Sequence, residues 1–178
     1  MVQRQNKALA LLFVTNIIVL VLLGVINAKL GQFGVFLYLP GLFFLPGALY
    51  LDNLRGIPLA FTTGLLLDQQ LECAFGFHAF ALTTLHLLGT RWVRGISYRR
   101  ELMPLLLQLP ANLLLFLLLL GWVKILENGS QDWKMARWGS DLMFSTLLLV
   151  PLAIWVPRFT NSLLEIVRLS PLGDEKLS

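Results

Sequence analysis

The side chains best suited to chemistry lie between residues 68 and 86, where an acid and two histidines interrupt apolar sequence. Asp68 ends an apolar run, and an acid in such a place is costly in lipid and usually faces a bundle interior or water. Alternatively, Asp68 is an interfacial residue that caps a helix beginning near Glu72. These two acids are four residues apart and could form a general acid/base pair, but the two intervening glutamines indicate a turn that breaks their helical relation.

Other catalytic and metal-binding chemistry lacks a recognisable pattern. His78 and His86 are eight residues apart, which turns them about 80° from each other on a helix. Neither has a carboxylate or thiol at ligand spacing, so we expect no metal site and no cofactor. Cys73 is the sole cysteine, which excludes an intrachain disulfide. The sequence contains neither a serine-hydrolase elbow nor a phosphate-binding loop, so we expect no enzyme.

The composition is that of a membrane protein. Apolar residues make up 57% of the 178 residues and charged residues 13%, against about 45–50% and 25% in soluble domains. A helix needs roughly 20 apolar residues to cross a hydrocarbon core of about 30 Å. The chain has six uncharged stretches of 12 to 22 residues: 8–28, 30–51, 56–67, 73–90, 102–123 and 142–157.

These stretches predict an all-α integral membrane protein with six transmembrane helices in one domain, residues 1–178. The expected helices are about 8–28, 31–51, 56–68, 72–90, 102–123 and 141–157, followed by an amphipathic segment at 158–169. Pro40 and Pro46 predict a kink in the second helix. The third is too short to span alone, so we expect a short or broken helix that turns at membrane depth and returns as the fourth.

The basic residues lie at the ends of the apolar runs, which argues against nucleic-acid binding. Their distribution instead indicates the orientation of the chain in the membrane. In the six-helix arrangement ten of the fourteen lie on the side that holds both termini, and four lie on the other. The positive-inside rule then places both termini in the cytoplasm. The ten are Arg4, Lys7, Arg55, Arg91, Arg94, Arg99, Arg100, Arg158, Arg168 and Lys176, and the four are Lys29, Lys124, Lys134 and Arg137.

Two further polar features bear on packing and partners. Gln108 and Asn112 are four residues apart, so they share one helix face and predict a polar stripe in the bundle interior. Residues 124–141 form the longest expected loop. Trp133 and Trp138 in it fit an aromatic belt at the membrane interface, and the alternative is a docking surface for another membrane protein.

The stretch 61–82 resembles the hallmark of the rod-shape-determining MreD family. In that family a G-x-x-x-D sequence ends one short helix, and a G-φ-x-A-L-like sequence opens the next. Gly64, Asp68 and Gly76 fall on the family's positions at the family's spacing. The sequence departs from this pattern at Glu72, where the family often has glycine, and at Phe80, where it usually has an aliphatic residue.

This resemblance implies a bacterial inner-membrane scaffold without enzymatic activity that regulates cell shape and peptidoglycan synthesis. The implied partners are the bitopic protein MreC and, through it, the actin-like MreB, the polymerase RodA and its transpeptidase. The family's fold is similar to the substrate-binding components of energy-coupling-factor vitamin transporters, which gives the rival interpretation of a small-molecule transport component. Those components commonly dock through an A-x-x-x-A pattern in the first helix, whereas Ala8 and Ala10 are two residues apart here.

Two expectations concern the turn between the third and fourth helices. Gly64 and Gly76 should let this turn pack closely against the first or second helix. Asp68 should accept hydrogen bonds from the free N–H groups at the start of the fourth helix, whose dipole favours a negative charge.

Overall fold

A computed structural model describes residues 2–71, 73–95, 103–126 and 132–166. These residues form helices joined by short irregular segments, with no strand among them. The six α-helices are α1 (Val2–Leu30), α2 (Phe44–Tyr50), α3 (Asn53–Gln70), α4 (Phe77–Gly95), α5 (Met103–Leu126) and α6 (Asp132–Ile166). Two 3-10 turns, Gly31–Phe33 and Pro40–Leu42, lie between α1 and α2.

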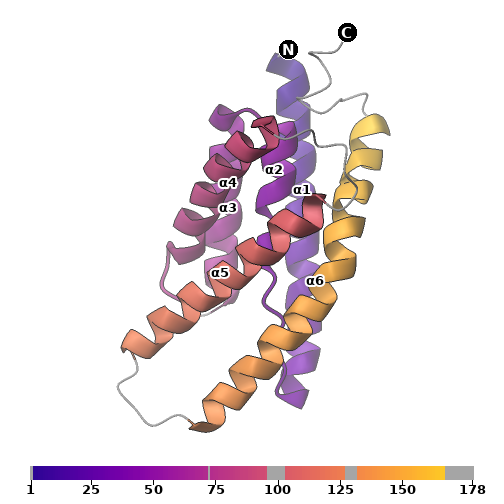
Figure 1. Cartoon of the computed structure of the whole chain (residues 1–178). Helices are drawn as coiled ribbons and strands as arrows, with labels where there is room; N and C mark the ends of the chain where they lie inside the picture. The colour runs from indigo at the N-terminus through magenta and orange to yellow at the C-terminus, as the bar shows by residue number, and fades with distance from the viewer. Residues whose placement is uncertain (1, 72, 96–102, 127–131, 167–178) are drawn as a thin grey trace.

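The chain runs back and forth between the two ends of the molecule, with α5 inclined to α1 (Figure 1). Arg55 Nε near the start of α3 donates to Asn6 Oδ1 near the start of α1, at 2.8 Å. Further along both helices, Asn16 Nδ2 donates to Thr63 Oγ1 at 3.1 Å. These two bonds place α3 beside α1 in the same direction, so the segment between them crosses the bundle in reverse. The start of α1 and the described end of α6 lie at the same end of the molecule.

Among the described residues, three helical segments are long and apolar enough to cross a membrane: Gln3–Phe33, Met103–Val123 and Arg137–Glu165. The apolar side chains of α1 are also strongly exposed, with Val21 at 55% and Val25 at 58%. A soluble protein seldom exposes a continuous apolar surface of this kind. The chain is therefore a helical membrane protein, as its composition predicts.

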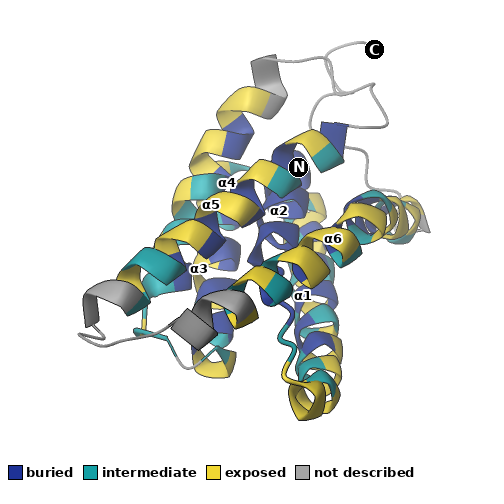
Figure 2. Cartoon of the chain, turned by 60° about the horizontal axis from the view of Figure 1, so that its bottom comes forward, coloured by how far each residue is buried: buried dark blue, intermediate teal, exposed yellow. Residues whose placement is uncertain are grey.

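The short helix α2 forms the centre of the core, shown dark blue in Figure 2. All seven of its residues, Phe44–Tyr50, are buried. It contacts α1, α3, α4 and α5. A helix that is apolar all round is stable only when other elements surround it, and this packing meets that condition.

Residues 35–39, between the two 3-10 turns, form an irregular segment, and side chains from other helices bond to its backbone. Asn27 of α1 accepts the Leu37 N–H at 2.8 Å and donates to the Leu37 carbonyl at 3.0 Å. Asp141 of α6 accepts the Phe36 N–H at 2.8 Å. Non-helical backbone at membrane depth needs such partners, because lipid supplies none.

The same pattern continues toward Gly41. Ser145 Oγ of α6 accepts the Tyr38 N–H at 2.8 Å. Asn112 of α5 donates to the Tyr38 carbonyl at 3.0 Å and accepts the Gly41 N–H at 3.0 Å. A Cβ atom on Gly41 would lie 2.8 Å from Asn112 Cβ, so glycine is needed for this approach. Polar side chains of α1, α5 and α6 therefore hold the irregular segment in place.

Gln108 and Asn112, predicted to share a polar stripe, are both buried, but only Asn112 is bonded to described residues. Asn112→Leu should lower the free energy of unfolding by about 1–3 kcal/mol for each backbone group left unpaired. Gln108→Met should leave stability unchanged or raise it, since neither polar atom of its side chain has a partner among the described residues. Thermal unfolding of the purified variants in detergent measures both. Equal losses in the two variants would contradict this assignment.

The prediction that the third helix is the short or broken one is wrong. Helix α3 has 18 residues, and the break lies in the second crossing, where 31–51 was expected to be one kinked helix. Asp52 accepts the Arg55 N–H at 3.1 Å and pairs with the Arg55 guanidinium at 2.6 Å. These charges cap the first turn of α3, so the uncharged run 56–67 understates the length of this helix.

The predicted bounds also differ in the second half of the chain. Helix α4 begins at Phe77 rather than residue 72, because the preceding residues form a turn. A single 35-residue helix, α6, replaces the second part of the 124–141 loop, the 141–157 helix and the amphipathic segment as far as Ile166. Pro151 and Pro157 lie inside it, as membrane helices tolerate. Residues 167–169 lie outside the described part of the chain.

Candidate functional site

The site lies where α3 and α4 meet, and Gly64 sets their separation. A Cβ atom on Gly64 would overlap the backbone N and Cα of Ala79 and the carbonyl carbon of His78. The absence of a side chain therefore lets the two backbones touch. This contact places Asp68, one helical turn further on, against the first turn of α4. The expectation that Gly64 packs against the first or second helix is wrong, because its partner is α4.

Gly76 has a conformational role rather than a packing role. Its φ of +96° lies in a region that side-chain-bearing residues rarely adopt. A Cβ atom there would meet nothing within 4 Å, so the expected close packing at Gly76 is wrong. The glycine lets the chain turn into α4 with its own N–H directed at Asp68.

Asp68 connects the end of α3 to the start of α4. Its Oδ2 accepts the Gly76 N–H at 2.8 Å, and its Oδ1 accepts the His78 N–H at 2.8 Å. The residue is 4% exposed. The expectation that N–H groups at the start of the fourth helix hold Asp68 is confirmed, and the positive end of the α4 dipole faces its charge. Asp68 is thus both buried and a helix cap, so the two interpretations coincide.

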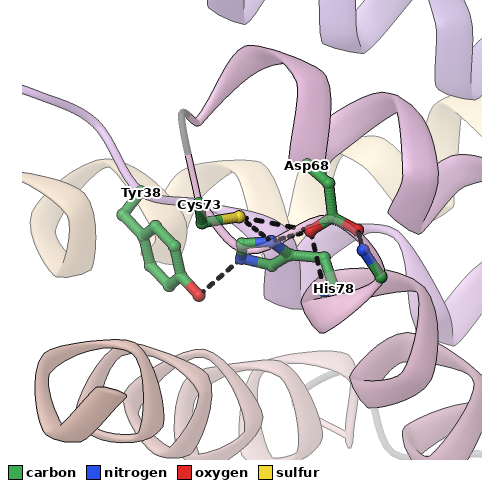
Figure 3. Close-up of polar contacts among 5 residues, drawn as sticks. Tyr38, Asp68, Cys73 and His78 are labelled. Carbon is green, nitrogen blue, oxygen red and sulfur yellow. Dashed lines mark hydrogen bonds and ion pairs between the residues drawn. The ribbon is translucent and has the colours of Figure 1, made fainter. Parts of the chain in front are cut away.

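His78 extends this contact to Tyr38 (Figure 3). Its Nδ1 lies 2.8 Å from Asp68 Oδ1, and its Nε2 lies 2.8 Å from the Tyr38 hydroxyl. A carboxylate only accepts hydrogen bonds, so Nδ1 carries the proton and Nε2 accepts from the hydroxyl. The neutral ring is thereby fixed in one tautomer by its two neighbours.

Cys73 completes the cluster. Its thiol donates to Asp68 Oδ1 at 3.2 Å, and its Sγ lies 3.4 Å from His78 Nδ1. The carboxylate then has four donors, three at Oδ1 and one, the Gly76 N–H, at Oδ2. The expectation that no thiol or carboxylate approaches a histidine is wrong for His78, because the turn folds back on itself. Glu72, considered as a partner for Asp68, lies outside the described residues.

A series of aromatic rings links the cluster to the last two helices. The Tyr38 ring lies 5.6 Å from the His78 ring and 5.5 Å from that of Phe116 on α5. Phe116 in turn packs edge-on against Trp138 of α6, with centroids 5.7 Å apart. Trp138, considered for partner docking, is therefore half-buried by the bundle itself. The side chain of Trp133 lies outside the described part of the structure.

The second histidine of α4 is not part of the cluster. His86 is fully buried, and its ring lies against Gly56 of α3, where a Cβ atom would overlap it. Gly56 and Gly64 thus line the same side of α3, where α4 packs. The two histidines of α4 therefore have different surroundings.

The geometry does not match a nucleophilic relay. In a Cys-His-Asp relay the nucleophile and the acid contact different ring nitrogens of the histidine. Here Cys73 and Asp68 both lie beside Nδ1, and Tyr38 occupies Nε2. Tyr38 and His78 are 2% and 0% exposed, so the described residues enclose both the hydroxyl and the ring. The arrangement suits holding a turn or binding an ion, rather than acyl transfer.

No protein-family model matches this chain, and no curated protein or solved structure is similar to it. The fold and the site define an all-helical membrane protein with a buried acid–histidine–thiol cluster. The sequence indicated Asp68, Gly64 and Gly76. It did not indicate that Tyr38, Cys73 and His78 belong to the cluster around Asp68. The regular spacing of five residues from Asp68 to Cys73 and on to His78 was the available signal.

Proposed function

We propose that the protein is a non-enzymatic inner-membrane scaffold of the bacterial elongation machinery, of the kind that the MreD family provides. The observation that carries the proposal is that all three motif residues help to form the junction between α3 and α4. Gly64 permits contact between α3 and α4, Gly76 turns the chain, and Asp68 joins the two helix ends. The resemblance would be fortuitous if these residues lay in unrelated places.

The packing is also suited to a scaffold. Polar side chains of α1, α5 and α6 bind the irregular segment 35–39 in the interior, and the aromatic series joins α4 to α6. In contrast to this polar interior, the outer faces of α1, α5 and α6 expose large apolar residues. In lipid, association uses such helix faces through close packing. A rigid interior with apolar outer faces would present fixed surfaces to other membrane helices.

In this proposal the chain crosses the membrane six times with both termini in the cytoplasm. The back-and-forth path of Figure 1 and the ten-to-four distribution of basic residues support this topology. Alkaline phosphatase fused after residue 178 should be inactive, and the same enzyme inserted after residue 129 should be active, because it works only outside the cytoplasm. An active C-terminal fusion would contradict the topology.

The partners would be an MreC-like bitopic protein and, with it, the RodA polymerase and its transpeptidase. Purification from native membranes in mild detergent, followed by mass spectrometry, tests this directly. We expect cell-wall synthesis proteins to copurify with the wild type. Copurification with an ATPase-containing transporter instead would support the rival vitamin-transport function.

A further inference from the structure

We propose that Asp68, Cys73 and His78 form a zinc site at the turn between α3 and α4. One ligand atom of each residue, a carboxylate oxygen, Sγ and a ring nitrogen, lies within 4.8 Å of the other two. The separations are 2.8 Å for Nδ1 to Oδ1, 3.2 Å for Sγ to Oδ1 and 3.4 Å for Sγ to Nδ1. This proposal is independent of the scaffold function, which would still stand if no zinc were bound.

These separations suit a tetrahedral ion. At usual zinc bond lengths, tetrahedral nitrogen, oxygen and sulfur ligands lie about 3.4 to 3.6 Å apart. The triangle in the structure is smaller by at most about 0.6 Å, which side-chain rotation can supply. A thiolate, an imidazole and a carboxylate together favour zinc over magnesium or calcium, which prefer oxygen ligands alone.

The proton balance is simple. The Cys73 thiol loses its proton to solvent, and the His78 ring remains neutral while its proton moves from Nδ1 to Nε2. Nδ1 is then free to bind the ion, and Nε2–H donates to the Tyr38 oxygen, which changes from donor to acceptor. One proton is released for each zinc ion bound, as expected when a thiolate forms.

The surroundings resemble the outer shell of a metal site. The Gly76 N–H donates to Asp68 Oδ2 and the His78 N–H donates to Oδ1, so the carboxylate is oriented toward the other two ligands before any ion arrives. Tyr38 fixes the His78 ring from its far side. Such partners orient metal ligands and raise their affinity. Cys73 is only half-buried, which gives an ion access and leaves the fourth coordination position for water.

Cobalt(II) titration of the metal-free, full-length protein in detergent tests the site. Cysteine occurs once in the chain, so any thiolate-to-cobalt charge-transfer band must come from Cys73. We expect this band to saturate at one cobalt per chain and to disappear when one equivalent of zinc is added. Cys73→Ser should abolish the band. Tyr38→Phe should weaken cobalt binding by about tenfold to a hundredfold, as loss of an outer-shell partner does.

Alkylation of Cys73 gives a second readout, which can be measured on the wild-type protein and so does not depend on whether a variant folds. Zinc should slow alkylation of Cys73 by iodoacetamide in the wild type, and His78→Gln should remove that protection. Saturation at half an equivalent would indicate a bridge between two chains and overturn the proposal. The absence of a charge-transfer band, or zinc affinity unchanged in Cys73→Ser, would overturn it as well.

Discussion

Replacing Gly64 with alanine should sharply reduce the amount of folded protein in the membrane. The added methyl group would overlap backbone atoms of Ala79 and His78, and backbone cannot move aside as a flexible side chain can. Overpacking of this kind costs about 1–3 kcal/mol and occasionally more. The two helices would have to separate, and Asp68 would be drawn away from the first turn of α4. Gly64→Leu should be worse still.

The matched control is Gly121→Ala on α5. A Cβ atom there meets nothing within 4 Å, so the same substitution should stabilise by about 0.4–1 kcal/mol through reduced freedom of the unfolded chain. Membrane abundance and thermal unfolding in detergent give both values. Unchanged accumulation and unfolding temperature in Gly64→Ala would show that the contact between α3 and α4 is not required.

Asp68→Leu should have the largest effect of any single polar substitution in the described chain. It leaves the N–H groups of Gly76 and His78, the His78 ring N–H and the Cys73 thiol without their acceptor. Each buried donor left unsatisfied costs about 1–3 kcal/mol. We expect little folded protein, measured by detergent-solubilised yield and unfolding temperature in the presence of a chelator.

Asp68→Asn should be milder than Asp68→Leu but clearly destabilising. An amide offers one acceptor oxygen, and whichever way it turns, its NH₂ group faces a donor. Asp52→Asn is the matched control, since Asp52 is a half-exposed cap of α3, and asparagine caps about as well as aspartate. Equal stability of Asp68→Asn and wild type would mean that the four-donor arrangement does not operate.

The sequence predicted the membrane class and two of the long helices, and the reason is local. Helices α1 and α5 follow uninterrupted apolar runs, 8–28 and 102–123, that are visible without any tertiary information. The start of α3 was predicted too late because Arg55 was taken to lie outside the helix. Arg55 lies in the first turn, where it pairs with the capping residue Asp52. Prolines were equally ambiguous: Pro40 lies at the break, whereas Pro151 lies inside α6.

The broken second crossing could not be predicted because its stabilisation is long-range. Phe36 is bonded to Asp141, and Tyr38 to Ser145, across more than a hundred residues of sequence. No local pattern reveals such pairs. The candidate site was only partly predictable for the same reason. Asp68 was identified from its cost in lipid, but Tyr38 reaches His78 from an irregular segment forty residues earlier.

We propose that this protein is a scaffold of cell elongation whose α3–α4 turn depends on Asp68. This proposal is tested most directly by depleting the protein in a rod-shaped bacterium that carries the gene, and measuring cell width during complementation. We expect depleted cells to widen and round up, the wild type to restore rods, Asp68→Asn to restore them in part and Asp68→Leu to fail. Depleted cells that keep their rod shape while vitamin uptake collapses would contradict the account.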